Sequence, residues 1–330
     1  MNAPARFDVS TGGELLGVLS ASTTGPLEDV DLLVKGIGGA EVNVAIGLAG
    51  LGHTVTWWGA VGDDPLGRQG LGVLGGAGVD TSAVRVDADH PTGLYLKERP
   101  DALTALACYY RAGSAAAQLR VDDLDIDQVL DCRLLHVTGV TAALPGGAEL
   151  LDQLTAAARQ RKVTVSLDVN ARPRLLAGRA AADVIGPLAA NADIVLATAE
   201  EARAVFGTDD HRHLANRCRD GGPALIVVHD AESATAITSA GPAATRPARE
   251  GSVVDPVGAG DAFAGGFLSG ILRGSTNAEA LDLAHRCAVR VLGVLGDNHA
   301  SPGGRRSTAP AAHSDAVGTV DDTYFRKGFT

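Results

Sequence analysis

A short stretch late in the chain joins bare backbone to an acid. Gly258, Ala259 and Gly260 carry almost no side chain, and Asp261 follows them where an apolar run with a helical pattern begins. A carboxylate at a helix start can act simply as an N-cap. Bare backbone at the same place also lets N–H groups point at an anion, which the helix dipole favours. An anion site with an acid beside it indicates the transfer of a charged group.

A second stretch, GGAEVNVAIGLAGLG (38–52), places two glycines and a polar side chain at a predicted helix start. As structure alone, it is an N-terminal turn followed by a core helix. As a binding site, the backbone at Gly39 would approach a ligand closely and Asn43 would hold a hydroxyl. The stretch by itself leaves both interpretations open.

A fold must bring these two stretches together, and the pattern of apolar residues along the chain predicts which fold it is. Short apolar runs alternate with longer helical patterns, which predicts an α/β fold with a mostly parallel sheet and helices on both faces. Ligands bind at the carboxyl ends of the strands in such sheets. Strands are expected over residues 55–61, 134–140, 163–169, 192–197 and 224–229, and helices over 66–78 and 149–161.

Two segments, residues 11–38 and 92–112, interrupt this alternation with short strand patterns and turns. We expect them to form a small second sheet, a lid over the open edge of the main domain. Residues 8–302 are assigned to one domain. Residues 303–330 are rich in Pro, Gly, Ala, Ser and Thr, so we expect this tail to be mostly disordered.

The composition argues against several classes of partner and site. The 330 residues carry a formal net charge of −11, which argues against nucleic acid or an anionic membrane as the main partner. No apolar run approaches the ~18 residues of a membrane span, and the start MNAPARFDVS lacks an apolar signal core. The four cysteines have no CxxC spacing, so we expect no disulfide framework or zinc site and a cytoplasmic location.

Other motifs are explained better by structure than by chemistry. GLGVLG (70–75) fits the glycine pattern of dinucleotide sites, but it lies inside a helical run and does not follow a strand. The chain has no GxxxxGK[ST] motif, which argues against a P-loop enzyme. His211 and His213 are two residues apart, so on a helix they would not share a face to bind a metal.

Together, the stretches 38–52 and 255–267 resemble the two signatures of the ribokinase-like (PfkB) family of carbohydrate kinases. The resemblance extends over roughly residues 8–302. It implies a ribokinase-like fold with ATP and Mg²⁺ as cofactors. It also implies that Asp261 is the catalytic base for a sugar's primary hydroxyl, and that the backbone at residues 258–260 holds the γ-phosphate.

Four further stretches resemble the 2-keto-3-deoxygluconate kinases within that family: residues 92–98, 109–116, 138–144 and 166–176. Arginine binds carboxylates through two parallel hydrogen bonds, which suits a sugar acid. For any single arginine, the alternative is an ion pair at the surface. The resemblance implies substrate contacts at Gly39, Asn43, Tyr95, Tyr109, Arg111, Asn170 and Arg172.

On the nucleotide side, the resemblance implies that Glu201 organises magnesium, through water, and the phosphates. Thr198 stands where the family usually has Asn or Ser. The late stretch LGDNHASPG (295–303) retains a family pattern expected near the adenine and brings Asn298 to the nucleotide.

One segment departs from the family. In IVVHDAESATA (226–236), His229, Ala231 and Ala234 stand where a basic residue and two glycines are expected. If these positions need positive φ, each alanine costs roughly 1 kcal/mol or more, and ATP binding is weakened. In the alternative, both alanines have negative φ in a rebuilt loop, and His229 makes its own nucleotide contact.

Three functions remain open at this point: a 2-keto-3-deoxygluconate kinase, a kinase for fructose, ribose or another keto acid sugar, and a sugar-binding protein that has lost catalysis. The intact GAGD sequence and Glu201 oppose the last. The resemblance also raises a monovalent cation site at the loop around Asp255. An exposed edge or apolar face on the small sheet would favour a homodimer formed through the lid.

Overall fold

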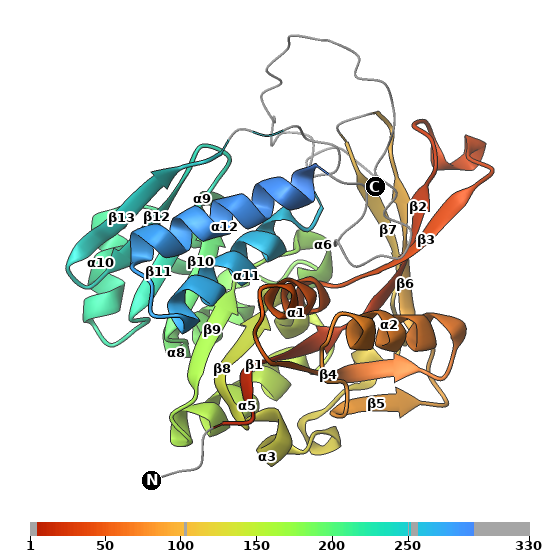
Figure 1. The fold of residues 1–330 in the computed structure, drawn as a ribbon, viewed down its shortest axis with the longest axis horizontal. Coiled ribbons are helices and arrows are strands. Elements are labelled where there is room, and N and C mark those ends of the chain that lie inside the picture. Colours follow the sequence, from red (N-terminus) through yellow and green to blue (C-terminus); the bar gives the residue numbers. More distant parts are fainter. Residues whose placement is uncertain (1–4, 102–103, 250, 252–256, 294–330) are drawn as a thin grey trace.

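The computed structural model describes residues 5–101, 104–249, 251 and 257–293. Two sheets organise these residues: a large sheet of nine strands with helices on both sides, and a sheet of four strands that extends away from it (Figure 1). The tail 303–330, Asn298 and Asp255 lie outside the described residues. None of the described helices is long and apolar enough to cross a membrane.

The large sheet has the strand order β13-β12-β11-β10-β9-β8-β1-β4-β5. All neighbours from β11 to β5 pair in parallel, and β12 and β13 add an antiparallel hairpin at one edge. The predicted mostly parallel α/β sheet is thus confirmed. The strands are β1 (Phe7–Glu14), β4 (Val55–Gly62), β5 (Val84–Asp87), β8 (Cys132–Thr138), β9 (Thr164–Asp168), β10 (Ile194–Thr198), β11 (Leu225–His229), β12 (Ser233–Thr238) and β13 (Gly241–Pro247).

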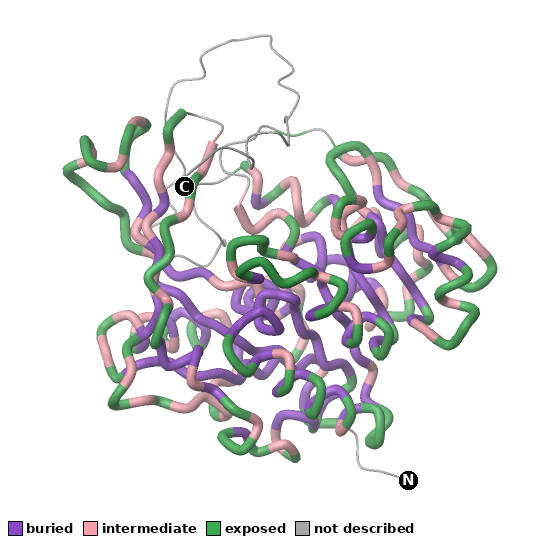
Figure 2. The backbone as a smooth tube through the Cα atoms, turned by 180° about the vertical axis from the view of Figure 1, so that it is seen from behind, coloured by how far each residue is buried: buried purple, intermediate pink, exposed green. Residues whose placement is uncertain are grey.

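Two hydrophobic cores lie on the two faces of this sheet, because successive side chains of a strand point to opposite faces. Trp57 belongs to the core that also contains residues of α1, α11 and α12, whereas Trp58 belongs to the core shared with α5, α8 and α9. Buried residues run through the interior of the molecule (Figure 2). Unbroken apolar strands are therefore explained by burial on both faces.

The helices α1 (Ala40–Gly50), α2 (Pro65–Gly76) and α5 (Gly147–Gln160) lie where the sequence predicts them. GLGVLG lies inside α2, whose N-cap Asp64 accepts hydrogen bonds from two backbone N–H groups, so it is a helical segment as expected. The other helices are α3 (Ile126–Val129), α4 (Gly139–Ala143), α6 (Pro173–Leu176), α7 (Ala181–Val184), α8 (Gly186–Asn191), α9 (Ala199–Phe206), α10 (His211–Arg219), α11 (Ala259–Leu272) and α12 (Asn277–Leu292), with 3₁₀ turns η1 (Leu27–Asp29), η2 (Ala116–Gln118) and η3 (Val121–Asp123).

Close packing of α11 on α12 explains part of the glycine-rich signature. A Cβ atom on Gly266 would lie 2.8 Å from the Cα of Ala284, and one on Gly270 would lie 2.7 Å from the Cα of Ala280. Glycine at these positions lets the two backbones approach each other. This packing fixes the direction in which α11 presents its N-terminus.

The small sheet has the order β3-β2-β6-β7, with strands β2 (Leu16–Ala21), β3 (Leu33–Gly38), β6 (Gly93–Glu98) and β7 (Leu106–Tyr110). The expected boundary of 11–38 is wrong at its start. Residues 11–14 continue β1 in the large sheet, where Thr11 pairs with Trp57 and Glu14 with Ala60. The small sheet therefore begins at Leu16.

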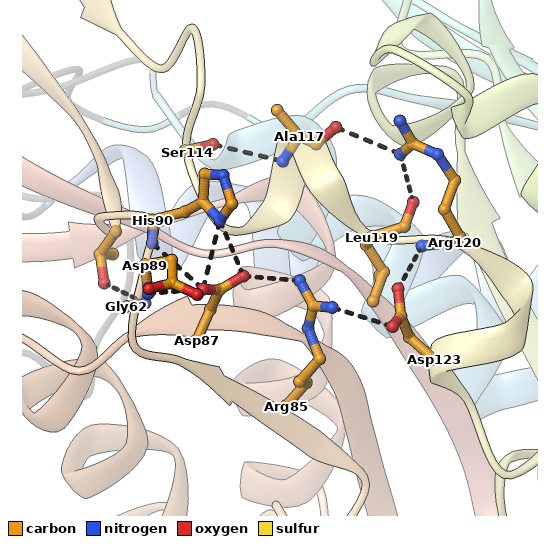
Figure 3. A network of polar contacts seen from close by, with 11 residues as sticks. Gly62, Arg85, Asp87, Asp89, His90, Ser114, Ala117, Leu119, Arg120 and Asp123 are labelled. Atoms are coloured by element: carbon orange, nitrogen blue, oxygen red, sulfur yellow. Dashed lines mark hydrogen bonds and ion pairs between the residues drawn. The ribbon is translucent and has the colours of Figure 1, made fainter.

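A network of charged groups fixes the connection from β5 to β6 (Figure 3). The guanidinium of Arg85 donates to Asp87 at 2.7 Å and to Asp123 at 2.8 Å. The Nδ1 atom of His90 lies 3.1 Å from the same Asp87 carboxylate. This network anchors the chain where it leaves the large sheet for the small one.

Candidate active site

The predicted site residues gather where the parallel strands of the large sheet end. In the pairing of the strands, Thr138 lies opposite Asp168, and Thr198 lies opposite His229. Carboxyl ends of parallel strands meet at one edge, which is the ligand edge of such sheets. The residues at the strand ends are Glu14, Thr138, Asp168, Thr198 and His229.

Asp261 lies in the first turn of α11 and is buried, with 7% of its surface exposed. The Nδ2 atom of Asn43 donates to its Oδ2 at 2.7 Å, and Nδ2 of Asn170 donates to its Oδ1 at 3.3 Å. The two amides come from α1 and from the loop after β9. Segments far apart in the sequence thus orient both oxygens of one carboxylate.

The start of α11 decides between the two interpretations of the GAGD stretch. Gly258 is the N-cap, with φ of 85° in the left-handed region, so the N-cap residue has no side chain that could accept from the first N–H groups. The first N–H groups of a helix have no acceptor within it. A Cβ atom on Gly260 would meet nothing within 4 Å. Asp261 is therefore not the N-cap, and the N-terminus of α11 lies beside its carboxylate.

Asn170 has the unusual positive φ of 37°, which asparagine tolerates better than most residues. Its Nδ2 also donates to Oδ2 of Asp168 at 3.1 Å. Burial raises the pKa of Asp168 well above its usual value, and the charges of Glu201 and Asp261 raise it further. Asp168 is not among the site residues predicted from the sequence, although its place at the end of a predicted strand is a usable signal.

Glu201 and Thr198 form a capping box at the start of α9. The N–H of Thr198 donates to Oε2 of Glu201 at 2.9 Å, and the N–H of Glu201 donates to the Thr198 hydroxyl at 3.2 Å. The N–H of Ala171 donates to the other oxygen, Oε1, at 2.8 Å. Both oxygens of Glu201 are thereby fixed in place beside the loop that carries Asn170.

His229 ends β11, and its ring stacks on Phe263 of α11 with centroids 4.5 Å apart. Burial lowers the pKa of His229, while the charges of Glu201 and Asp230 act in the opposite direction. The ring is thus held against the helix that carries Asp261.

Of the two alternatives for Ala231 and Ala234, the one that requires positive φ is contradicted by the backbone. Among the described residues, positive φ outside glycine occurs at Lys162, Asn170 and Ala177. Ala234 is a buried residue of β12, paired with His229. Asp230 closes the turn instead, since its Oδ1 accepts N–H bonds from residues 232 and 233, both at 2.8 Å. An aspartate turn replaces the glycines, which matches the alternative of a rebuilt loop.

The small sheet carries Tyr95 and Tyr109 on neighbouring strands, with ring centroids 5.3 Å apart. Tyr95 is buried and Tyr109 is exposed. The guanidinium of Arg111 lies 5.2 Å from the centre of the Tyr109 ring and forms an ion pair with Glu14. Both members of this pair are largely buried, so the alternative of a surface ion pair does not apply to Arg111.

Arg172 has a different setting. It is exposed and precedes the short helix α6, and the described residues contain no ion pair that involves it. Its positive charge lowers the pKa of Asp168, against the larger effect of burial. Arg172 is therefore a cation at the open side of the site.

Two buried glutamates escaped the sequence analysis. Glu41 accepts hydrogen bonds from the hydroxyls of Thr138 at 2.6 Å and Thr141 at 2.5 Å. Burial raises its pKa, and the charge of Asp261 adds to the increase. Glu14 lies next to Gly39, whose φ is 135° and whose absent Cβ would lie 2.3 Å from the Glu14 carbonyl oxygen. The close approach at Gly39 is thus to the protein's own backbone.

The arrangement combines an oriented buried carboxylate, a helix N-terminus with glycine as its N-cap, a cluster of carboxylates and two arginines. Such a site can hold an anionic group at the helix end and remove a proton from a nucleophile beside it.

Comparison with known proteins agrees with this chemistry. A family model described as pfkB family carbohydrate kinase matches residues 11–303. A 2-dehydro-3-deoxygluconokinase of Thermoproteus tenax is 34% identical over 310 residues, which cover 92% of this chain and 94% of that protein. The structure of a 2-dehydro-3-deoxygluconokinase from Thermotoga maritima has a TM-score of 0.80 at 26% identity, covering 89% of this chain and 96% of that one. An Escherichia coli structure described as a ribokinase II with ATP and Mg²⁺ has a TM-score of 0.81 at 21% identity, covering 88% and 94%, and shows the shared fold.

Proposed function

Because this chain belongs to the pfkB family of carbohydrate kinases, we propose that it transfers the γ-phosphate of ATP to the primary hydroxyl of 2-dehydro-3-deoxygluconate, the sugar acid also called 2-keto-3-deoxygluconate. The observation that carries the proposal is the buried Asp261 carboxylate, held by Asn43 and Asn170 beside the N-terminus of α11, whose N-cap is Gly258.

In this mechanism Asp261 accepts the proton of the sugar hydroxyl as the hydroxyl oxygen attacks the γ-phosphorus. The backbone N–H groups of Gly258, Ala259 and Gly260 bind the phosphate oxygens, where negative charge is placed favourably at a helix N-terminus. Because these donors are fixed before the reaction, they stabilise the transition state without reorganisation. Orientation by Asn43 and Asn170 keeps the base in line with the hydroxyl.

The sugar acid is recognised by residues of both sheets. Arg111 and Arg172 bind its carboxylate, which suits the planar guanidinium fork. Support for Arg111 comes from its buried Nε–H, which has no hydrogen-bond acceptor among the described residues. A carboxylate would satisfy that donor. The other residues proposed to contact the sugar are Gly39, Asn43, Tyr95, Tyr109 and Asn170.

ATP is proposed to lie beside β10, β11 and α11, against Thr198, Glu201, His229 and Ala231. Ala234, the other alanine that the resemblance places at the nucleotide, is fully buried in β12 and offers no surface for this contact. The described residues contain no group of three or more carboxylate, histidine or cysteine side chains that could hold a metal ion, so Mg²⁺ would bind chiefly to the phosphates of ATP. Its charge would relieve the repulsion of Asp168 by Glu201 and Asp261, which adds to the effect of burial on the pKa of Asp168. Magnesium would be held near Glu201 and Asp168, with Glu201 acting through water. When bound, it neutralises charge on the phosphates. A monovalent cation and a cytoplasmic location stay predictions.

The small sheet is proposed to close over the sugar and exclude water, which would otherwise compete as the phosphate acceptor. Its outer strands expose large apolar side chains, so we also propose that it forms the contact of a homodimer. These side chains are Leu33, Val34, Leu106 and Tyr110.

The substrate assignment is tested by ATP consumption with a panel of sugars and sugar acids. We expect the highest kcat/KM with 2-dehydro-3-deoxygluconate. Preference for fructose or ribose would contradict the assignment and leave the family unchanged. The alternative of a sugar-binding protein without catalysis is supported by the departure of segment 229–234 from the family pattern, but the positive φ that would strain Ala231 and Ala234 there is not observed.

A further inference from the structure

The chain passes between the two sheets four times, and one side chain lies at the centre of these crossings. The connections are those after β1, before α1, before β6 and after β7. Glu14 is the last residue of β1, and its side chain is 1% exposed. A charge buried this deeply is costly unless it is paired.

Each crossing contacts Glu14. At the second, the Glu14 carbonyl oxygen lies 2.3 Å from the position of a Cβ on Gly39, and at the third, Oε1 lies 3.1 Å from that of a Cβ on Gly93. At the fourth, Arg111 forms the ion pair with Oε2 and the Ser114 hydroxyl donates to Oε1 at 3.4 Å. The Glu14 carboxylate therefore joins the base of the small sheet to the end of β1.

Arg111 is the cation of this junction. Its guanidinium is held between Glu14 and the Tyr109 ring, while Nε–H has no acceptor among the described residues. A second carboxylate that reaches the guanidinium can bind the unused donor and draw the group away from Glu14. The incoming carboxylate and Glu14 then share one positive charge.

Resting on the proposed function, we propose that Glu14 is the positioning residue for Arg111, and that Glu14 takes up a proton from solvent when the sugar acid's carboxylate binds this arginine. The change is a simple protonation: the carboxylate of Glu14 becomes a neutral carboxylic acid, and no other bond is made or broken. Binding of the sugar acid is thereby linked to the Glu14–Arg111 ion pair, which lies where the small sheet connects to the large one.

The electrostatics of the free protein support this exchange. Burial raises the pKa of Glu14 to about 7, the Arg111 guanidinium opposes that increase, and the carboxylate of Glu41 adds to it. These are the charged groups that act on Glu14 from the segment after β7 and from α1. A substrate carboxylate weakens the lowering effect of Arg111 and adds a negative charge, so the pKa rises further. Proton uptake is then largest just above pH 7, and binding weakens as pH increases.

Calorimetric titration with 2-dehydro-3-deoxygluconate, in the absence of nucleotide, measures this proton. The titration is run at about pH 7.5 in two buffers with different ionisation enthalpies, where the sugar carboxylate is already ionised. We expect a fractional proton taken up per sugar acid bound. We also expect KM for the sugar acid to rise several-fold from about pH 7 to about pH 9.

Two isosteric variants test which glutamate takes up the proton. Glu14→Gln should bind the sugar acid with no proton uptake and a flat pH profile of KM, because glutamine imitates the protonated acid and still accepts from Arg111. Glu41→Gln, the matched change at the neighbouring buried glutamate, should retain uptake. Loss of uptake in Glu41→Gln with uptake retained in Glu14→Gln would overturn the proposal.

The wild-type protein alone can also overturn it. Turnover of the sugar acid with no proton taken up would refute the role of Glu14 and leave the proposed function standing. A protein that phosphorylates other sugars and neither binds nor turns over the sugar acid would refute the proposed substrate, and this inference with it.

Discussion

At the scale of the residue, the candidate site is a cluster of acids with few cations. The negative charge of one acid raises the pKa of the next. Glu41 acts in this way on Glu14, and Asp261 acts on Glu41. Asp261 and Glu201 both act on Asp168. Within this cluster, Arg111 and Arg172 act on Glu14 and Asp168. An acidic sugar and ATP bring further negative charge, so the two arginines should matter most for acidic substrates.

We expect Arg111→Ala and Arg172→Ala each to raise KM for the sugar acid about tenfold or more, because a hydrogen bond to a charged group contributes ~1.5–3 kcal/mol. KM for a neutral sugar should change much less. Arg174→Ala, at another exposed arginine beside Arg172, is the matched control and should leave both values unchanged. Equal losses for acidic and neutral sugars would refute carboxylate recognition. Steady-state kinetics with both substrates gives the comparison.

The residues predicted from sequence are those that stand in recognisable motifs. Asn43, Asn170 and Asp261 were named from their stretches, and hydrogen bonds join them in the fold. Glu14 and Glu41 could not be found in this way. Their partners Arg111, Thr138 and Thr141 are about a hundred positions away in the chain, so only the folded backbone reveals the pairs.

At the scale of the element, α9 is tied to the site by its capping box. Thr198→Ala removes a cap worth about 1 kcal/mol and loosens Glu201. We expect a lower free energy of unfolding in urea, together with a severalfold increase in KM for ATP. Glu201 is fixed by the same hydrogen bonds that cap the helix, so the two effects should appear together.

The chain offers a matched control for this change. Thr276 and Glu279 form the same capping box at the start of α12. The N–H of Thr276 donates to the Glu279 carboxylate at 2.9 Å, and the N–H of Glu279 donates to the Thr276 hydroxyl at 3.3 Å. Thr276→Ala should lower stability similarly and leave KM for ATP unchanged. If both variants changed KM for ATP equally, the effect would be general loosening and the role of Glu201 would lose support.

The hairpin of β11 and β12 gives a second prediction about elements. Ala231→Gly combined with Ala234→Gly should not tighten binding of a non-hydrolysable ATP analogue, because neither alanine has positive φ. The double variant should melt at a lower temperature. Each glycine makes the unfolded chain more flexible than alanine does, which lowers the free energy of unfolding by about 0.4–1 kcal/mol. Tighter binding of the analogue would mean that the alanines do strain the loop. Calorimetry and thermal unfolding measure the two effects.

Elements were predictable where burial on both faces gave long apolar runs, and less so elsewhere. The strands β12 and β13 were missed because alanine, glycine and proline have low strand propensity and because β13 is an edge strand. The end of β1 was misplaced for another reason. A Cβ on Gly12 would lie 2.2 Å from the Trp58 ring, so the Trp58 side chain occupies the space beside Gly12. Only glycine fits there, and glycine does not give the apolar pattern by which a buried strand is recognised in a sequence.

At the scale of the whole molecule, the small sheet leaves apolar side chains on its outer strands. Val34 of β3 is 48% exposed and Tyr110 of β7 is 59% exposed. If a second copy covers this surface, light scattering should give the mass of a dimer, and Val34→Glu should shift the protein towards monomer by burying an unpaired charge.

Val86 is the matched control for that experiment, because it is 53% exposed on β5, the edge strand of the large sheet. Val86→Glu should leave the dimer intact. A wild-type monomer at the concentrations of the kinetic assays would contradict the proposed contact.

The central claim is that Asp261 removes the proton from the sugar hydroxyl while the helix N-terminus holds the phosphate. The most direct measurement is kcat of Asp261→Asn, together with calorimetric binding of the sugar acid and of a non-hydrolysable ATP analogue. Asparagine keeps the size of the side chain, so the fold and both affinities should persist. Turnover should fall by a factor of about 10²–10⁴, which is the usual contribution of a general base. Turnover close to wild type, with binding intact, would contradict the assignment of Asp261 as the base.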